Sequence, residues 1–479
     1  MKSLFFLFFF TKIAYGMKQD TTYVDIKSSK NSFFEIQNKL GEQTLGVLKI
    51  RLSGKFYLGK SLISKRKNVV LSFNKGAKII FTSSVQTGFL IKHDNISVIN
   101  GQFEGNGVSS NTFYSGYGIF LYGVKNCVIK NNTFNKISGI NIYLGPNDKN
   151  QGCKNNLIEK NRIYDPRFYF AQKGTDEAGI LLGYSGYGYA HKNNTIRNNY
   201  IDGNNVLKIG TGIIGHGSGN IFEANTIKNC LNYGVVCYES QATDVSLSNN
   251  KVLYNVIENI GEIGNRTTVK GMGIYLMKSH NSSIIGNKVC NTLRNSDKTE
   301  TLGAGAISTS GSLNVTVSKN EIVGSNMYGY TNDYGFNSTF ADNTIANVRK
   351  SAIYLINVSN IIVSNNKISS VGEVVLKGYF ENTALPYIKN QWKTDLVLNK
   401  VTGKGILIRR NKIYSNNQLL YFRGTKKEEL GIDNAIGQNE FTDNEVYYTG
   451  KFVQNEEMIA FRVTDNTNII KDNIFKELK

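Results

Sequence analysis

Short runs of alternating apolar and polar residues, each closed by Gly, Asn or Ser, recur along most of the chain. The stretch 210–240, GTGIIGHGSGNIFEANTIKNCLNYGVVCYES, contains one complete unit and the start of the next. From Phe89 onward the unit returns at intervals of about 21 to 24 residues wherever no insertion intervenes. Alternation predicts half-buried β-strands, and a fixed period predicts a solenoid in which each turn lies on the next.

An asparagine followed two residues later by an aliphatic residue or Phe marks almost every unit. The marked positions are Asn132, Asn161, Asn199, Asn225, Asn250, Asn287, Asn320, Asn343, Asn366, Asn411, Asn444 and Asn473. Asparagine tolerates the left-handed backbone of a sharp corner, and its amide can bond to a neighbour above and below. The spacing therefore predicts a stacked asparagine ladder. No helical periodicity lies between the markers, which excludes a helical solenoid.

The N-terminal region follows a different pattern. Asn31 to Leu40, NSFFEIQNKL, has a helical apolar stripe that includes Gln37, with Asn31 or Ser32 as cap and Gly41 as stop. Strand-like runs follow it. We therefore expect an N-terminal cap and first coils over 17–88 and a solenoid over 89–479. Insertions interrupt the period at 164–178, 258–272, 290–303 and 379–393. Long loops in regular arrays often carry function.

On these repeats the chain resembles the right-handed parallel β-helix proteins of the pectin-lyase-like superfamily. The resemblance implies an all-β solenoid of about twelve coils, closed by the N-terminal helix. That superfamily includes lyases, hydrolases, epimerases, adhesins and binding proteins, so the fold alone does not identify a reaction.

Charge and the N-terminus narrow the partners. The formal net charge is +20, from 56 basic and 36 acidic residues spread along the sequence, and such a surface attracts anions. Residues 1–16 read as a signal peptide: a Lys, an apolar run from Leu4 to Phe10, then small residues at the cleavage site. We therefore expect a secreted or periplasmic protein, with no membrane span after cleavage and no nucleic acid partner. An acidic polysaccharide is the expected ligand; the oligomeric state is left open.

Five cysteines are too few for a disulfide scaffold. Cys237 is expected in the core, and a bond between Cys127 and Cys153 on adjacent coils is left open.

Aligning the strands predicts a column of outward side chains. Its members are Tyr122, Tyr143, Tyr184, His216, Tyr238, Met277, Ser310, Asp333, Ile356, Lys377, Arg423 and Arg462. Aromatic rings at steps of about 4.8 Å suit the stacking of a sugar chain. The alternative is that these rings only stabilise the sheet by stacking on one another.

His216 is the first catalytic candidate, because flanking glycines are expected to leave its ring exposed and a neutral imidazole can accept a proton. Tyr184 or Tyr238 would supply the acid of a β-elimination. Lys278 and the basic residues Arg167, Lys173, Arg266, Lys270 and Arg294 would neutralise a sugar carboxylate, with Tyr122, Tyr143 and Asp333 as further substrate contacts.

The carboxylates allow two other interpretations. Glu239 with Asp176 or Glu177 would form the pair of an inverting hydrolase. The other interpretation is that either carboxylate holds a Lys, an Arg or Ca²⁺. No Cys/His cluster has zinc spacing, and no metal ligand is assigned.

Two short motifs resemble those of known enzymes. Gly215-His216-Gly217 is similar to a motif of the polygalacturonases, but the paired aspartates one turn earlier and the Arg-Ile-Lys are missing. Tyr164-Asp165-Pro166-Arg167 resembles the Asp-Pro-His of alginate epimerases, with Arg in place of His.

The sequence thus favours an enzyme that binds and cleaves a uronate-containing polysaccharide by β-elimination. A glycoside hydrolase and a non-catalytic glycan-binding or surface-structural β-helix are the two alternatives.

Overall fold

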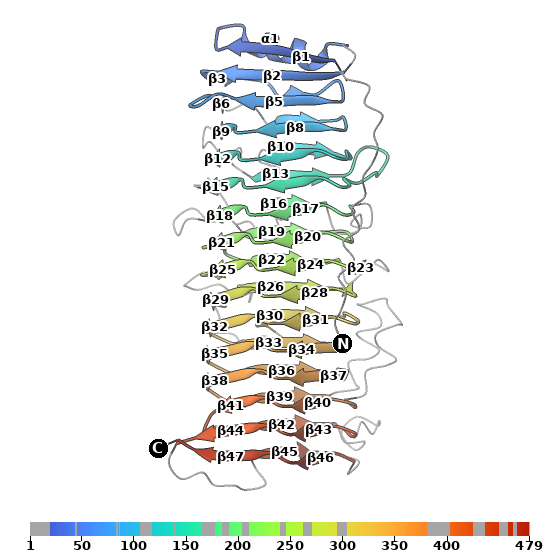
Figure 1. Cartoon of the computed structure of the whole chain (residues 1–479), viewed down its shortest axis with the longest axis vertical. Coiled ribbons are helices and arrows are strands. Elements are labelled where there is room, and N and C mark those ends of the chain that lie inside the picture. Colours follow the sequence, from blue (N-terminus) through green and yellow to red (C-terminus); the bar gives the residue numbers. More distant parts are fainter. Residues whose placement is uncertain are drawn as a thin grey trace, which may run out of the picture.

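The computed structural model describes the chain as a stack of turns built from three parallel sheets (Figure 1). The described residues are 20–43, 46–82, 85, 87–105, 117–137, 139–164, 178–183, 191–203, 210–239, 246–261, 271–294, 304–380, 403–424, 436–449, 458–462 and 467–478. The expected signal peptide at 1–16 and most residues of the four insertions lie outside these ranges.

Each turn contributes one strand to each sheet, and each strand pairs in parallel with its counterpart one turn later. The 16-stranded sheet consists of β1 (Thr21–Lys27), β2 (Val47–Ser53), β5 (Val69–Phe73), β8 (Ile96–Ile99), β11 (Val128–Lys130), β14 (Leu157–Glu159), β17 (Thr195–Arg197), β20 (Ile221–Glu223), β24 (Lys251–Leu253), β28 (Ser283–Ile285), β31 (Thr316–Ser318), β34 (Phe336–Ala341), β37 (Ser359–Ser364), β40 (Leu407–Arg409), β43 (Glu440–Thr442) and β46 (Ile469–Lys471).

The 15-stranded sheet follows it in each turn. It consists of β3 (Lys55–Leu58), β6 (Lys78–Phe81), β9 (Gln102–Glu104), β12 (Thr133–Asn135), β15 (Arg162–Tyr164), β18 (Tyr200–Asp202), β21 (Thr226–Lys228), β25 (Val256–Glu258), β29 (Lys288–Thr292), β32 (Glu321–Ser325), β35 (Thr344–Val348), β38 (Lys367–Val371), β41 (Lys412–Tyr414), β44 (Glu445–Tyr448) and β47 (Ile474–Glu477).

The 14-stranded sheet completes the turn. It consists of β4 (Leu62–Ile63), β7 (Thr87–Ile91), β10 (Tyr117–Tyr122), β13 (Ile140–Gly145), β16 (Ala178–Leu182), β19 (Thr211–Gly215), β22 (Tyr233–Cys237), β26 (Met272–Met277), β30 (Gly305–Ser310), β33 (Tyr328–Asp333), β36 (Ile353–Ile356), β39 (Leu376–Tyr379), β42 (Leu420–Arg423) and β45 (Ile459–Arg462). A short pair, β23 (Leu247–Ser248) with β27 (Ser279–His280), lies beside the sheets. The solenoid exceeds the twelve expected coils because the first turns lack the asparagine marker.

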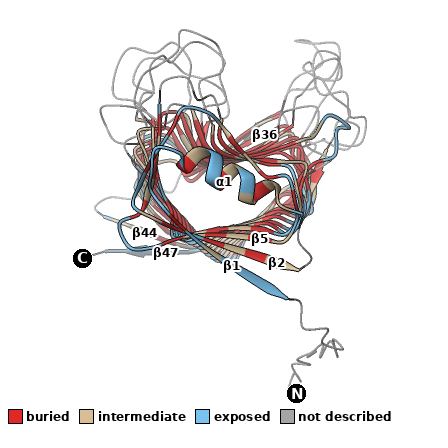
Figure 2. Cartoon of the chain, turned by 90° about the horizontal axis from the view of Figure 1, so that it is seen from above, coloured by how far each residue is buried: buried red, intermediate tan, exposed pale blue. Residues whose placement is uncertain are grey.

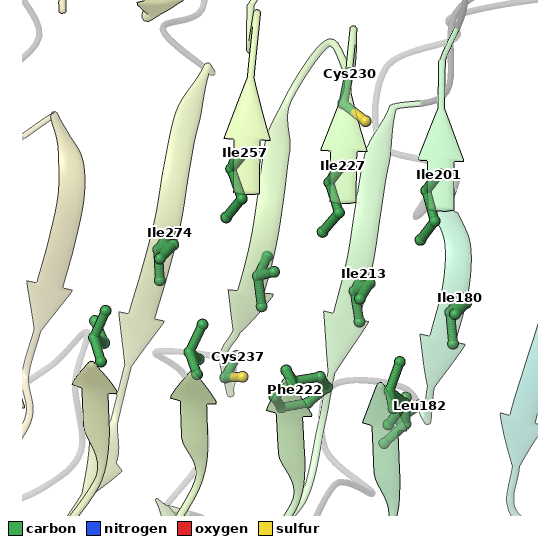
Figure 3. Close-up of a cluster of buried hydrophobic side chains, with 14 of the residues drawn as sticks. Ile180, Leu182, Ile201, Ile213, Phe222, Ile227, Cys230, Cys237, Ile257 and Ile274 are labelled. Carbon is green, nitrogen blue, oxygen red and sulfur yellow. The ribbon is translucent and has the colours of Figure 1, made fainter. Parts of the chain in front are cut away.

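One continuous apolar core fills the space that the three sheets enclose. Ile213 pairs in register with Ile180 on one side and Val235 on the other, and all three are fully buried. Figure 3 shows that Ile201, Ile227 and other inward side chains repeat from strand to strand. The half-buried strands predicted from the alternating pattern are therefore confirmed, since one face of each strand builds the core.

The asparagine ladder is confirmed from Asn132 to Asn473, with amide-to-amide distances of 2.9 to 3.1 Å along its length. One assignment was wrong. Asn255, not Asn250, belongs to it. Asn250 extends a second ladder that links Asn156, Asn194 and Asn220 at another corner. Both asparagines have the same short motif, so the motif alone did not separate the corners.

The predicted helix is α1 (Ser32–Gly41), which lies across the N-terminal opening of the solenoid (Figure 2). Ile36 and Leu40 are buried under it. Asn31 occupies the cap position without a side-chain cap bond, so the expected Asn31 cap bond is absent. The Gln37 amide exchanges two hydrogen bonds of 2.9 Å with the backbone of Ile63, which ties the helix to β4.

All five cysteines are free thiols, so the possible bond between Cys127 and Cys153 is not formed. Burial raises the pKa of both thiols to about 12. Within the described ranges, no helix combines the length and apolar character needed to cross a membrane.

Candidate functional site

The outer face of the 14-stranded sheet carries two parallel columns of side chains, spaced by about 4.8 Å per strand. The central column is Phe120, Tyr143, Leu181, Ile214, Val236, Tyr275, Ser308, Thr331, Tyr354, Lys377, Tyr421 and Ala460. The distal column, two residues further along each strand, is Tyr122, Gly145, Gly183, His216, Tyr238, Met277, Ser310, Asp333, Ile356, Tyr379, Arg423 and Arg462.

The distal column corrects two predicted positions. Tyr143 pairs with Phe120 rather than Tyr122, and Lys377 pairs with Tyr354 rather than Ile356. Both belong to the central column, and Tyr143 is buried. A slip of two residues keeps every side chain on its face, so alternation does not reveal it. Tyr184 lies outside the described residues, and Gly183 occupies the column position beside His216.

His216 is fully buried, contrary to the expectation of an exposed ring. Its ring packs edge-on against Tyr238 at 4.5 Å between centroids. Burial lowers the pKa of His216 from 6.5 to about 3. His191, also buried, lies nearby, and a Cβ added at Gly183 would stand 2.7 Å from its Nε2. An imidazole with such a low pKa is a weak base at neutral pH.

Glu239 and Lys278, two other predicted catalytic residues, are also fully buried. Both have interaction partners, so neither is an isolated charge. Like His216, both side chains are closed to solvent beneath the outer face of the 14-stranded sheet. The structure thus gathers three of the predicted catalytic residues without exposing them.

Tyr122 lies at the N-terminal end of the distal column beside a pocket of about 430 Å³. Its hydroxyl donates a hydrogen bond to Asp148, which raises the pKa of the phenol. The Lys92 ammonium stands 5.2 Å from the centre of its ring. Lys67, Lys92, Lys125 and Lys154 line the pocket, with Asp94 as its described acidic residue. This end of the face is basic.

Asp333 lies in the distal column on β33, and its pKa is raised. Burial raises the pKa of its carboxyl from 3.8 to about 7, against the effect of a hydrogen bond from Ser310. Ser310 Oγ donates that bond to Asp333 Oδ2 over 3.3 Å. The other oxygen, Oδ1, is buried and makes no hydrogen bond with any described residue. At neutral pH this carboxyl is therefore close to half ionised.

Tyr275 lies near the same group. Burial raises the pKa of its phenol, the nearby Tyr233 and Asp333 add to the rise, and the Ser310 hydroxyl opposes it. The Tyr275 hydroxyl also points at Met277 Sδ, 3.2 Å away. Tyr275, Ser310 and Asp333 come from β26, β30 and β33, three consecutive strands. We call these three residues the acid–base cluster.

Aromatic rings from β33 and β36, with cations beside them, lie near the acid–base cluster. Tyr328 and Tyr354 pack at 4.7 Å between centroids. The Lys350 ammonium lies 5.9 Å from the Tyr328 ring centre, and that of Lys377 lies 5.6 Å from the Tyr354 ring centre. Lys377 is on β39, and its ammonium lies over Tyr354 on β36. The strand next to β36 on the other side is β33, which carries Asp333.

Hydroxyl groups occupy the central column between the rings. Thr331 Oγ1 donates a hydrogen bond of 2.8 Å to Ser308 Oγ. Sequence reasoning missed Tyr275, Ser308, Thr331 and Tyr354 as a set. Their signal was present: each stands two residues before a member of the predicted column.

Seven of the predicted site residues lie outside the described ranges and stay predictions: Asp176, Glu177, Tyr184, Arg167, Lys173, Arg266 and Lys270. Arg294 is described, but it lines a groove at the corner between the 15- and 14-stranded sheets rather than the face itself. Among the described side chains, no three of His, Cys, Asp or Glu come together as a metal site.

A family model described as a right-handed β-helix region matches residues 117–292 and 264–384. It confirms the right-handed parallel β-helix predicted from the repeats. No curated protein matches the sequence.

Several solved structures are similar. The surface adhesin PfbA of Streptococcus pneumoniae has a TM-score of 0.51 at 15% identity, over 73% of this chain and 86% of the adhesin. The A-module of the mannuronan C-5 epimerase AlgE6 of Azotobacter vinelandii has a TM-score of 0.45 at 12% identity, over 94% of each chain. The catalytic domain of a GH87 α-1,3-glucanase has a TM-score of 0.45 at 11% identity, over 74% of this chain and 65% of that domain. At these identities the adhesin supports the fold.

Proposed function

We propose that this chain, which belongs to the family of proteins with a right-handed β-helix region, binds an acidic polysaccharide along the outer face of its 14-stranded sheet and cleaves it by β-elimination. The observation that carries the proposal is Asp333, a half-buried carboxyl with a pKa of about 7, set among hydroxyls, tyrosines and lysines. Tyrosine faces stack on sugar rings, and ammonium groups bind carboxylates.

The first step of the proposed reaction is removal of the proton at C5 of a uronate. Asp333 in its ionised form takes this proton. Because Oδ1 is closed to solvent, rotation of the side chain brings it to the sugar. Lys377, with Lys350 on the neighbouring ring, stabilises the negative charge that develops on the sugar carboxylate.

The second step breaks the bond between C4 and its oxygen. The electron pair of the former C5–H bond becomes the C4–C5 double bond, and the departing oxygen takes a proton from the Tyr275 hydroxyl. After product release Asp333 gives up its proton to solvent and the Tyr275 phenolate takes one up from solvent, while Ser310 keeps its hydrogen bond to Asp333. The cluster ends the cycle in its starting state.

A hydrolytic pair is less well supported on the described face. Glu239 follows Tyr238, and Asp333 is three strands further along, which corresponds to about 14 Å. Inverting hydrolases hold their carboxyls about 6.5 to 9.5 Å apart. The alternative pairing of Glu239 with Asp176 or Glu177 stays a prediction, since both partners lie outside the described residues.

The test is a turnover assay of the full chain on uronate polysaccharides, with ultraviolet absorbance for the unsaturated product and a reducing-end assay in parallel. Asp333→Asn is expected to lower turnover by about 10² to 10⁴. Asp342→Asn is the matched control, because Asp342 is exposed on the turn after β34, at the opposite side of the solenoid.

Reducing ends without ultraviolet absorbance would replace elimination by hydrolysis. Binding without any product would leave the non-catalytic glycan-binding alternative. Equal turnover by wild type and Asp333→Asn would remove the acid–base cluster from the mechanism.

A further inference from the structure

A second concave site lies at the corner between the 15- and 14-stranded sheets, outside the acid–base cluster. It is a groove of about 730 Å³, within the size range of ligand sites. The turns after β25, β29, β32, β35 and β38 form its walls, so it runs along the solenoid axis.

A break in a row of side chains opens this groove. At this corner Asn229, Asn259 and Asn291 form a short outer ladder with amide bonds of 3.2 Å. The next position in register is Gly324, followed by Asn347. A Cβ added at Gly324 would stand 2.8 Å from Asn291 Oδ1. The missing side chain leaves the ladder unfinished and gives the groove its depth.

One of the residues that line the groove carries a buried hydroxyl without a hydrogen-bond partner among the described residues. Thr292 is only 1% exposed and lines the groove. Its hydroxyl makes no hydrogen bond with the residues that the structure describes. Asn259, Asn291 and Asn347 also line the groove, and side-chain amides recognise sugar hydroxyls because they donate and accept hydrogen bonds.

The charged residues that line the groove favour an anionic ligand. Arg294 and Arg349 line the groove, and none of the described lining residues is Asp or Glu. The two arginines lie on turns two coils apart, at about 10 Å in steps of the solenoid. A guanidinium binds a carboxylate through two parallel hydrogen bonds, which an ammonium does not.

We propose that this groove is a second binding site, which holds a carboxylate-bearing oligosaccharide between Arg294 and Arg349. The inference rests on the proposed function, because it takes the ligand to be another stretch of the same acidic polysaccharide. The groove anchors the polymer, while the acid–base cluster reacts with it.

The test is calorimetric titration of a galacturonate oligosaccharide, in the Asp333→Asn background so that the probe is not consumed. Arg294→Gln and Arg349→Gln are each expected to weaken binding about tenfold. Arg409→Gln is the matched control, since Arg409 lies on β40 in the 16-stranded sheet. Melting temperatures equal to that of the parent establish that the variants are folded.

Gly324→Asn supplies an independent variant that removes no charge. Gly324 has φ +71°, and its neighbours in register, Asn291 and Asn347, are asparagines with φ 51° and 55°. The backbone therefore accepts an asparagine, and the Asn291 side chain has to shift because the new Cβ lies 2.8 Å from its Oδ1. The new side chain extends from the outer ladder into the groove. Gly324→Asn is expected to weaken binding of the same galacturonate oligosaccharide at least as much as Arg294→Gln does.

Unchanged affinity in all three variants would overturn the proposal that the groove binds the oligosaccharide. The turnover result for Asp333 would not be affected. Equal binding of a neutral galactose oligosaccharide, or full displacement by inorganic sulfate, would overturn its selectivity for a carboxylate sugar. Conversely, loss of binding in these variants, with turnover unaffected by Asp333→Asn, would keep the groove and reject the proposed role of the acid–base cluster.

Discussion

The outer face of the 14-stranded sheet has two halves that share one backbone but differ in their side chains. In the N-terminal half the central column is Leu181, Ile214 and Val236, all buried in a cluster separate from the main core. In the C-terminal half it is Tyr275, Ser308, Thr331, Tyr354 and Lys377.

Each half holds an ionisable group in the distal column, and burial shifts each towards its neutral form. The shift takes His216 away from the physiological range and brings Asp333 into it. The same physical effect therefore lowers the pKa of His216 in one half and raises the pKa of Asp333 in the other. Burial alone is not a sign of function; the direction of the shift decides.

The largest expected contrast is in stability. Leu181→Ala is expected to lower the free energy of unfolding by about 2 to 5 kcal/mol, because it deletes a fully buried side chain. Asp333→Asn should lose none at pH 8, since folding raises the pKa of that carboxyl and so disfavours its charge. Chemical denaturation of both variants at pH 8 makes the comparison. A stable Leu181→Ala protein would show that the apolar half is not structural.

The pH dependence of unfolding separates the halves next. His216 and His191 have folded pKa values of about 3 and 4, below the ordinary 6.5. The unfolded state takes up protons below pH 6.5 and the folded state does not, so stability is present above that pH and falls with acid. Each imidazole contributes up to about 1.4 kcal/mol per pH unit between 6.5 and its folded pKa.

The measurement is the unfolding free energy from pH 7 to 4.5 for wild type and the His191→Gln/His216→Gln variant. The variant should lose less stability over this range. Identical slopes would contradict the buried neutral histidines. Asp333 acts in the opposite direction: its folded pKa is raised, so its contribution is present at low pH and is lost as pH rises through about 7.

The smallest contrast concerns binding at the C-terminal half. Lys377→Gln removes the ammonium above Tyr354. It is expected to weaken the binding of a uronate polymer by about 0.5 to 1 kcal/mol. Added salt should shrink the difference, because salt screens exposed charges. Lys412→Gln, on β41 of the 15-stranded sheet, is the matched control. An effect of the same size in both variants would mean that net charge, rather than position, controls affinity.

Periodicity predicted the fold because many weak signals agree. A dozen asparagines at similar spacing define a ladder even though one of them, Asn250, belongs to a neighbouring corner. Alternation also placed His216, Ser310 and Asp333 in one column. It placed Tyr143 and Lys377 two residues off, since a slip of two changes neither face nor polarity.

The site was harder to predict because exposure depends on neighbours from other turns. His216 stands between glycines in the sequence, which suggested an open ring, yet the structure buries it beside Tyr238. Asp333 was predicted as a substrate contact only. Its raised pKa comes from burial by surrounding turns, which no local pattern expresses.

The asparagine ladder also bears on how such a chain can change its length over generations. Every link between Asn132 and Asn473 has the same chemistry, an amide that donates to the amide of the next turn. A duplicated whole turn inserted between two others would find a donor on one side and an acceptor on the other. A partial turn would leave buried amides unmatched, at a cost of about 1 to 3 kcal/mol each. We therefore expect natural variants of this chain to gain or lose entire turns, while their loops vary freely.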